Sequence, residues 1–155
     1  MNEARVAAHF PKLMEKGFAV TSPFNEEYNC IAFAAGDVTR WWWPGGGTGH
    51  YWPTPGEAAT LDAFQRAFRA LGYEVCADGD FVPGVEKIAI FVSPNGTPTH
   101  AARQLPDGAW TSKLGMDVDI RHNAADGVEG DIYGRIACYM SRPISVDGVR
   151  GSRAN

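Results

Sequence analysis

The stretch of sequence that decides the fold is residues 87–115, KIAIFVSPNGTPTHAARQLPDGAWTSKLG. It holds three β-favouring segments, at 87–92, 99–105 and 109–115, with a Pro-Asn-Gly and a Pro-Asp-Gly turn between them. Turns this short join neighbouring antiparallel strands, because they leave no room for a crossover. The stretch therefore predicts an antiparallel meander. We expect one more strand over 133–140 and a loop over 117–130.

Two helical segments precede this meander. Apolar residues at near-helical spacing over 4–15, interrupted by Pro11, indicate one short helix or two turns that end at Gly17. A second apolar helix is predicted to begin at Cys30 and to end at Gly36. The thiol of Cys30 would then lie in the first turn of that helix, where backbone N–H groups are unpaired.

The strongest helix signal covers 54–72. Thr54 is placed as the N-cap, Glu57 completes a capping box, and Gly72 ends the helix. Its apolar face is predicted to consist of Ala58, Leu61, Phe64, Phe68 and Leu71. Helices followed by a meander are typical of an α+β fold. We expect a single domain over 1–150 and a frayed tail at 151–155.

Composition narrows the classes of function. With 155 residues, 45% of them hydrophobic and 21% charged, the chain can bury one ordinary core. A net charge of −4 without a basic stripe argues against a nucleic-acid partner. No apolar run approaches the length of a membrane span, so we expect no membrane partner. The sequence makes no prediction of the oligomeric state.

The cysteines and the N-terminal residues of the chain indicate the cellular compartment of the protein. Cys30, Cys76 and Cys138 are far apart and lack a Cys-x-x-Cys spacing, which argues against a disulfide scaffold and a zinc ribbon. The beginning of the chain, MNEARVAAHFPK, is not a signal peptide, because it has no long apolar run. A cytoplasmic location is expected, with export without a cleaved signal as the alternative.

Three side chains suggest nucleophilic catalysis. A helix N-terminus lowers the pKa of a thiol such as that of Cys30. His100, held on a strand, is placed to act as a general base. Ser112 follows on the next strand across a short turn, where a side chain can orient an imidazole. The neighbouring Lys113 is expected to reach solvent along its aliphatic stem.

Two segments, YNCIAFA (28–34) and THAARQLPDGAWTS (99–112), resemble the NlpC-like branch of the papain-fold cysteine peptidases and amidases. The resemblance implies a papain-like fold in which N-terminal helices pack on the antiparallel meander. It also implies Cys30 as the nucleophile, His100 as the base and Ser112 as the residue that orients the base.

The segment 41–53, WWWPGGGTGHYWP, is rich in aromatic residues and glycine. One interpretation is a substrate-binding wall formed by Trp42, Trp43 and Trp52 together with Asn29. The other is a loop that packs as a lid over the core.

These observations predict a cysteine-dependent hydrolase of amide or thioester bonds, a peptidase, amidase or deamidase, acting on a peptide or another amide-bearing substrate. The alternative is a non-catalytic protein- or glycan-binding module on the same fold that uses the loop 41–53; Asn29 and Ile31, which differ from the residues usual beside the nucleophile, favour it. Asp117, Asp119 and His122 are interpreted as solvated loop residues rather than as metal ligands. No metal or cofactor is expected.

Overall fold

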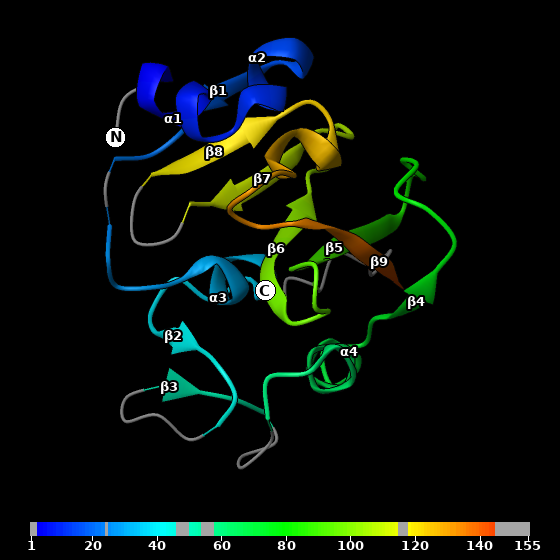
Figure 1. The fold of residues 1–155 in the computed structure, drawn as a ribbon. Coiled ribbons are helices and arrows are strands. Elements are labelled where there is room, and N and C mark those ends of the chain that lie inside the picture. Colours follow the sequence, from blue (N-terminus) through cyan, green and yellow to red (C-terminus); the bar gives the residue numbers. More distant parts are fainter. Residues whose placement is uncertain (1–2, 24, 46–49, 54–57, 115–117, 145–155) are drawn as a thin grey trace.

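A computed structural model describes residues 3–23, 25–45, 50–53, 58–114 and 118–144. Its main feature is a seven-stranded antiparallel sheet with the order β1-β8-β7-β6-β5-β9-β4 (Figure 1). The strands are β1 (Phe18–Val20), β4 (Glu74–Cys76), β5 (Val85–Val92), β6 (Pro98–Gln104), β7 (Trp110–Lys113), β8 (Asp119–His122) and β9 (Arg135–Pro143). This sheet, with its few short helices, confirms the α+β class. The predicted tail at 151–155 lies outside the described residues.

The predicted meander is present as β5, β6 and β7. β5 pairs with β6 along most of its length, with Phe91 opposite His100. β6 pairs with β7 only through Arg103 and Gln104, so the His100 end of β6 extends beyond this pairing. The free edge of β6 at this end is where the candidate site forms.

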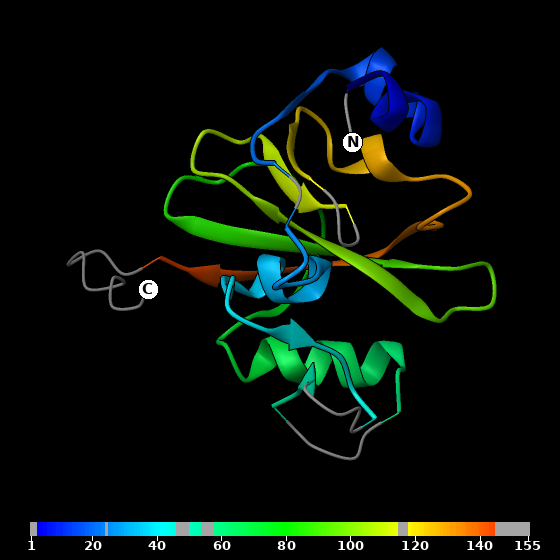
Figure 2. The ribbon, with the colours of Figure 1, turned by 90° about the vertical axis from the view of Figure 1, so that its left-hand side faces the viewer.

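Helices cover both faces of the sheet. They are α1 (Glu3–His9), α2 (Pro11–Lys16), α3 (Cys30–Ala35) and α4 (Leu61–Arg69), with a 3₁₀ turn η1 (Ala125–Val128). In Figure 2 the sheet runs across the middle of the molecule, with α1, α2 and η1 on one side and α3 and α4 on the other. The two faces therefore bury two separate cores.

Alternation along β5 divides the apolar side chains between these cores. Ile88 and Ile90 pack with residues of α3 and α4, such as Ile31 and Phe64. Ala89 and Phe91 belong to the second core, which α1, α2, the residue between them and η1 cover with Val6, Leu13, Phe10 and Val128. This two-residue period is the expected consequence of strand geometry in a sheet that is covered on both faces.

The helix predicted over 54–72 is shorter than expected. α4 begins at Leu61, and the side chain of Thr60 caps it by accepting a hydrogen bond of 3.1 Å from the N–H of Ala63. Ala58 precedes the helix and Leu71 follows it, so the predicted apolar face was too long at both ends. The predicted capping box at Thr54 and Glu57 lies outside the described residues.

Several short strands were not predicted. The loop expected over 117–130 contains β8 and η1, and β8 pairs with β1 on one side and β7 on the other. The aromatic segment contributes β2 (Trp41–Trp42) and β3 (His50–Tyr51), which pair in parallel as a separate two-stranded sheet. Within the residues described, no helix has both the length and the apolar character needed to cross a membrane.

Candidate active site

Cys30 is the first residue of α3, as predicted. Asn29 is the N-cap: its side-chain oxygen accepts hydrogen bonds of 3.1 Å from the N–H groups of Ala32 and Trp42. Its side-chain nitrogen donates to the carbonyl of Trp42 at 2.9 Å. Asn29, which we had predicted to bind substrate, therefore ties the start of α3 to β2 with both of its polar atoms.

The thiol of Cys30 lies against the free edge of β6. Its Sγ donates a long hydrogen bond of 3.9 Å to the carbonyl of Thr99, and the backbone N–H of Ala101 faces the sulfur. These two peptide groups flank His100 in the chain. The thiol therefore contacts the backbone on both sides of the residue predicted to be its base.

The electrostatic environment of this thiol differs from the prediction. Burial raises the pKa of Cys30 to about 11, although the N–H groups of Ala101, Ile31 and Cys30 and the charge of Lys113 act in the opposite direction. The N–H groups at the start of α3 act to lower this pKa, as predicted, but the net shift is upward because the side chain is only 7% exposed and desolvation is the larger effect. At neutral pH the resting group is a thiol, so its proton must be removed before it can attack a carbonyl.

The imidazole of His100 is fully buried beside Ser112. Its Nε2 lies 3.0 Å from Ser112 Oγ, the contact that the sequence predicts for an orienting residue. The ring lies 5.1 Å from that of Phe91 between centroids and also stacks on Tyr133. Burial, with a smaller effect of His122, lowers the pKa of His100 well below its usual value, so the ring is neutral at pH 7 and is a weaker base than a solvent-exposed imidazole.

The thiol contacts the backbone on both sides of His100, and no hydrogen bond joins it to the ring. Among the residues described, Nδ1 of His100 is buried without a hydrogen-bonding partner, while the thiol is directed to Thr99. The His100 ring packs against aromatic residues of the second core, whereas Cys30 belongs to the first. The structure thus brings Cys30 to the backbone of His100 and Ser112 to its ring, and it contains no direct hydrogen bond between Cys30 and the ring.

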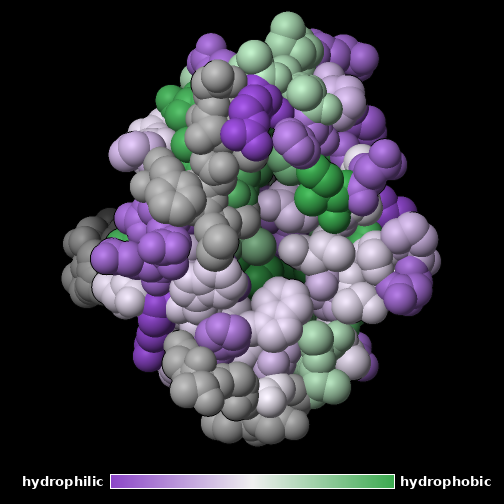
Figure 3. Space-filling model, turned by 60° about the vertical axis from the view of Figure 1, so that its left-hand side comes forward, coloured by the Kyte–Doolittle hydropathy of each residue, from purple (hydrophilic) through white to green (hydrophobic). Residues whose placement is uncertain are grey.

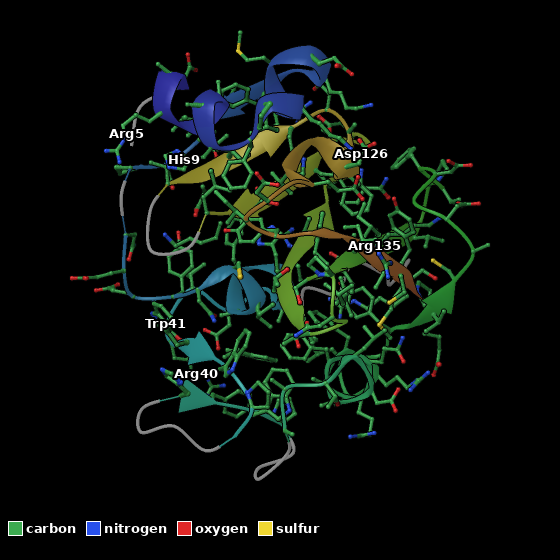
Figure 4. The ribbon with its side chains drawn as sticks, in the orientation of Figure 1. Arg5, His9, Arg40, Trp41, Asp126 and Arg135 are labelled. Atoms are coloured by element: carbon green, nitrogen blue, oxygen red, sulfur yellow. The ribbon has the colours of Figure 1, made fainter. Side chains whose placement is uncertain are left out.

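A pocket of about 370 Å³ opens beside the thiol. It is lined by Cys30 together with Asn29, Trp41, Trp43, His50, Thr99 and Tyr133. Figure 3, which views the side of the molecule that carries α3 and β2, shows a recess with hydrophobic atoms at its base. Trp41 projects from β2 toward the segment that leads to α3 (Figure 4), and its indole nitrogen donates to the carbonyl of Glu26 at 2.8 Å.

The three tryptophans predicted to bind substrate occupy different positions. Trp43 lines the pocket. Trp42 and Trp52 are each 5% exposed and pack in the first core, where the indole nitrogen of Trp42 donates to Asp37 at 2.9 Å. These two rings pack in the core and are not among the residues that line the pocket, so the lid interpretation describes them better than the substrate-wall interpretation.

Two residues near the thiol, His50 and Lys113, were missed or misread from the sequence. Trp41 and His50 line the pocket with their rings stacked, 5.8 Å apart between centroids. Lys113 is fully buried, donates to the carbonyl of Asn25 and lies 4.9 Å above the ring of Tyr28, so the expectation that it reaches solvent was wrong. No local pattern distinguishes a lysine of this kind, because its burial depends on α3 and the segment before it.

The residues weighed as metal ligands are not brought together. Asp119 accepts a hydrogen bond of 2.7 Å from the hydroxyl of Tyr28, on the sheet face opposite to the ring of His122, and Asp117 lies outside the described residues. No group of three or more metal-binding side chains occurs in the described part of the chain. His122 is not a solvated loop residue, since it is fully buried on β8 and contacts Ser112.

Fold and site together define a small α+β domain in which a buried thiol lies against the part of a central strand, β6, that its neighbour β7 does not cover, with a histidine–serine pair close by. The family model described as Domain of unknown function (DUF7689) matches residues 19–141, and the chain belongs to this family. The match spans α3, the meander and nearly all of β9. None of the curated proteins and none of the solved structures matches the chain.

Proposed function

We propose that this protein is a thiol hydrolase that cleaves an amide or thioester bond, on a papain-like fold of the NlpC-like type. One observation carries the proposal. The Cys30 thiol lies against the peptide groups on both sides of His100, whose Nε2 is held by Ser112 and whose Nδ1 has no partner. A neutral ring nitrogen with no hydrogen-bonding partner among the described residues has a lone pair that can accept the thiol proton, as general-base catalysis requires.

In the proposed reaction the Cys30 side chain leaves the Thr99 carbonyl and turns toward Nδ1 of His100. The S–H proton passes to Nδ1 while the sulfur attacks the carbonyl carbon, and the carbonyl electron pair moves to oxygen. The imidazolium then protonates the leaving amine or thiolate as its bond to carbon breaks. Water, deprotonated by His100, hydrolyses the resulting thioester and regenerates the thiol.

Backbone donors are available for the oxyanion. The N–H groups of Cys30, Ile31 and Ala101 all face the sulfur. Donors that are fixed in position stabilise a developing negative charge without reorganising. The buried ammonium of Lys113, whose charge lowers the pKa of Cys30, adds to the stabilisation of a thiolate or oxyanion.

The pocket indicates the substrate class. Its aromatic rings Trp41, Trp43 and Tyr133 are suited to an apolar or aromatic group on the acyl side of the scissile bond. We therefore propose peptide or other amide-bearing substrates with such a group next to the carbonyl.

The test is acylation of Cys30 by a reactive thioester with an aromatic acyl group, followed by intact-protein mass spectrometry and peptide mapping. We expect one acyl group per chain, on Cys30, and a rate about 100-fold lower in His100→Gln. Cys76→Ser is the matched control, and in this variant Cys30 should be acylated at the wild-type rate. Equal labelling of all three cysteines, or a rate that does not depend on His100, would contradict the proposal.

The second candidate is the non-catalytic binding module. It is favoured by the raised pKa of Cys30 and by the lack of a bond between the thiol and the His100 ring. In that case a stable aromatic amide should bind equally well to wild type and Cys30→Ala in calorimetry, and the thioester should not acylate Cys30. A Trp43→Ala variant should lose the binding.

A further inference from the structure

A second buried imidazole lies beyond Ser112. The hydroxyl oxygen of Ser112 lies 3.0 Å from Nε2 of His100 on β6 and 2.9 Å from Nε2 of His122 on β8. The other ring nitrogen of His122, Nδ1, lies 2.8 Å from the carbonyl oxygen of Ala124. His100, Ser112 and His122 are all fully buried, so this row of hydrogen bonds is closed to bulk water.

The direction of each hydrogen bond in this row follows from the carbonyl of Ala124, which lies at one end of the row. A carbonyl oxygen only accepts, so Nδ1 of His122 must carry a proton. Burial lowers the pKa of His122 to about 4, against smaller raising effects of the Ala124 carbonyl and of Asp126, so the ring is neutral and its Nε2 is an acceptor. The hydroxyl of Ser112 therefore donates to His122.

The same reasoning extends to His100. Because the hydroxyl of Ser112 donates its proton to His122, its oxygen can only accept a hydrogen bond from His100. Nε2 of His100 must therefore carry a proton and donate it to Ser112. The ring of His100 is also neutral, so its Nδ1 carries none. The opposite direction would set the lone pairs of Ser112 and His122 against each other at 2.9 Å.

We propose that His122 is a positioning residue that acts through Ser112 to keep His100 in the tautomer with its proton on Nε2, which leaves Nδ1 free to accept the proton of Cys30. The catalytic meaning of this inference rests on the proposed function, whereas the tautomer itself does not. The row is directional because it ends on a group that only accepts. Its three side chains come from β6, β7 and β8, which the sheet places side by side.

The test reads the tautomers directly. In protein labelled with ¹⁵N at histidine, two-bond ¹H–¹⁵N spectra near neutral pH show which ring nitrogen carries the proton. The chain has four histidines, of which His9 and His50 are exposed; His9→Gln and His50→Gln assign their signals. We expect the proton of His100 on Nε2 and that of His122 on Nδ1.

Two variants of His122 form a matched pair. In His122→Leu the hydroxyl of Ser112 has lost its acceptor and turns to donate to His100, so the proton of His100 should move to Nδ1. His122→Gln restores a side-chain acceptor and should keep the proton on Nε2. The rate of Cys30 acylation should fall about tenfold or more in the leucine variant and recover in the glutamine variant.

Three outcomes would overturn the inference: a proton on Nδ1 of His100 in the wild type, an unchanged tautomer in His122→Leu, or the same acylation rate in both variants. If His122→Leu does not fold, Ser112→Ala removes the bridge and should give His100 a mixture of tautomers; a pure Nε2–H form would overturn the inference. Predicted tautomers in a protein that is never acylated would refute the hydrolase proposal and leave the tautomer assignment standing.

Discussion

The imidazole of His100 stacks on the phenol ring of Tyr133, with centroids 4.0 Å apart and an angle of 10° between the planes. Tyr133 in turn stacks on Phe10 at 5.3 Å, so the imidazole is anchored to the second core through two successive ring contacts. Thr99, next to His100, donates its hydroxyl to the carbonyl of Tyr133. The segment before β9 therefore holds both the ring and the backbone of the proposed base.

We predict that Tyr133→Ala lowers the rate of Cys30 acylation by about tenfold to a hundredfold, because the His100 ring loses the surface that fixes its plane. Tyr133→Phe keeps that surface and should stay within about threefold of the wild type. Single-turnover acylation, followed by mass spectrometry, makes the comparison. Equal rates in all three proteins would show that the stack has no role in positioning the base.

Stability should depend on pH because two imidazoles are buried in the neutral form. The pKa of His122 falls from 6.5 to about 4 on folding, and that of His100 is lowered as well. Below pH 6.5 the unfolded chain binds protons that the folded chain does not, so the free energy of unfolding decreases as the pH falls. Above pH 6.5 the neutral imidazoles make their full contribution to stability. From His122 alone we expect a loss of about 2 kcal/mol between pH ~7 and ~5.

Urea unfolding at these two pH values measures this loss. His122→Gln should remove the His122 part of the pH dependence. The carboxyl groups with lowered pKa values, Asp37 and Glu129 among them, titrate mainly below this window. A variant as sensitive to pH as the wild type would show that His122 is not the group that titrates.

Trp41 should decide which acyl groups the site accepts. It lines the pocket beside Cys30 and stacks on His50. We expect Trp41→Ala to raise KM about tenfold for a substrate with an aromatic acyl group and to change little for an acetyl substrate. Phe81→Ala is the control, because Phe81 is exposed and does not line this pocket. The same KM increase for both substrates would mean that the ring does not contact the acyl group.

The first core depends on Phe64, which is fully buried on α4 and packs against Trp43 and Trp52 at centroid distances of 5.4 and 4.9 Å. Truncation of a buried phenylalanine leaves a cavity, so Phe64→Ala should lower the free energy of unfolding by about 4 kcal/mol. Met14→Ala is the matched control, since that side chain is 71% exposed, and should change stability by about 0.5 kcal/mol or less. Denaturant unfolding of the two variants tests the difference.

Alanine substitutions at Gly134 and Gly36 distinguish the cost of backbone strain from the cost of a steric clash. Both have a positive φ, +77° and +89°, but a Cβ on Gly134 would lie 1.9 Å from the carbonyl oxygen of Val92, whereas a Cβ on Gly36 would meet nothing within 4 Å. We expect Gly36→Ala to cost about 1 kcal/mol and Gly134→Ala clearly more, because the start of β9 must move away from β5. Thermal unfolding of both variants is the measurement, and equal costs would exclude a role for the clash.

Much of the fold could be predicted from local patterns. The Gly-containing turns on both sides of β6 and the β-favouring segments around them specify three strands of the sheet, because such turns bring strands together over a few residues. The helix start at Cys30 was also predicted correctly, since Asn29 is a good N-cap and Gly36 a good end. β1 and β8 were missed, because three- and four-residue strands have too few positions to show a periodic pattern.

The candidate site was predicted only in part. Ser112 was placed against His100 from the turn between their strands, and that contact is present. The contact of His122 with Ser112 was missed because His122 comes from β8, which pairs with β7 on the side away from β6, and no turn in the sequence predicts this neighbour. Trp42 and Trp43 are adjacent and alike in chemistry, yet only Trp43 lines the pocket, because the packing of β2 against α3 and α4 decides the direction of each ring.

The sequence by itself determined the α+β class, the meander, and which residue types are available for chemistry, because turns, caps and two-residue alternation act over a few neighbouring positions. The tertiary structure alone decided the protonation states of Cys30 and the two buried histidines and the hydrogen-bonding partners of Ser112. Burial raised the pKa of Cys30 and lowered those of both imidazoles, and the strand order placed Ser112 between two histidines. Desolvation and strand order depend on segments distant in the chain, so no local pattern contains them.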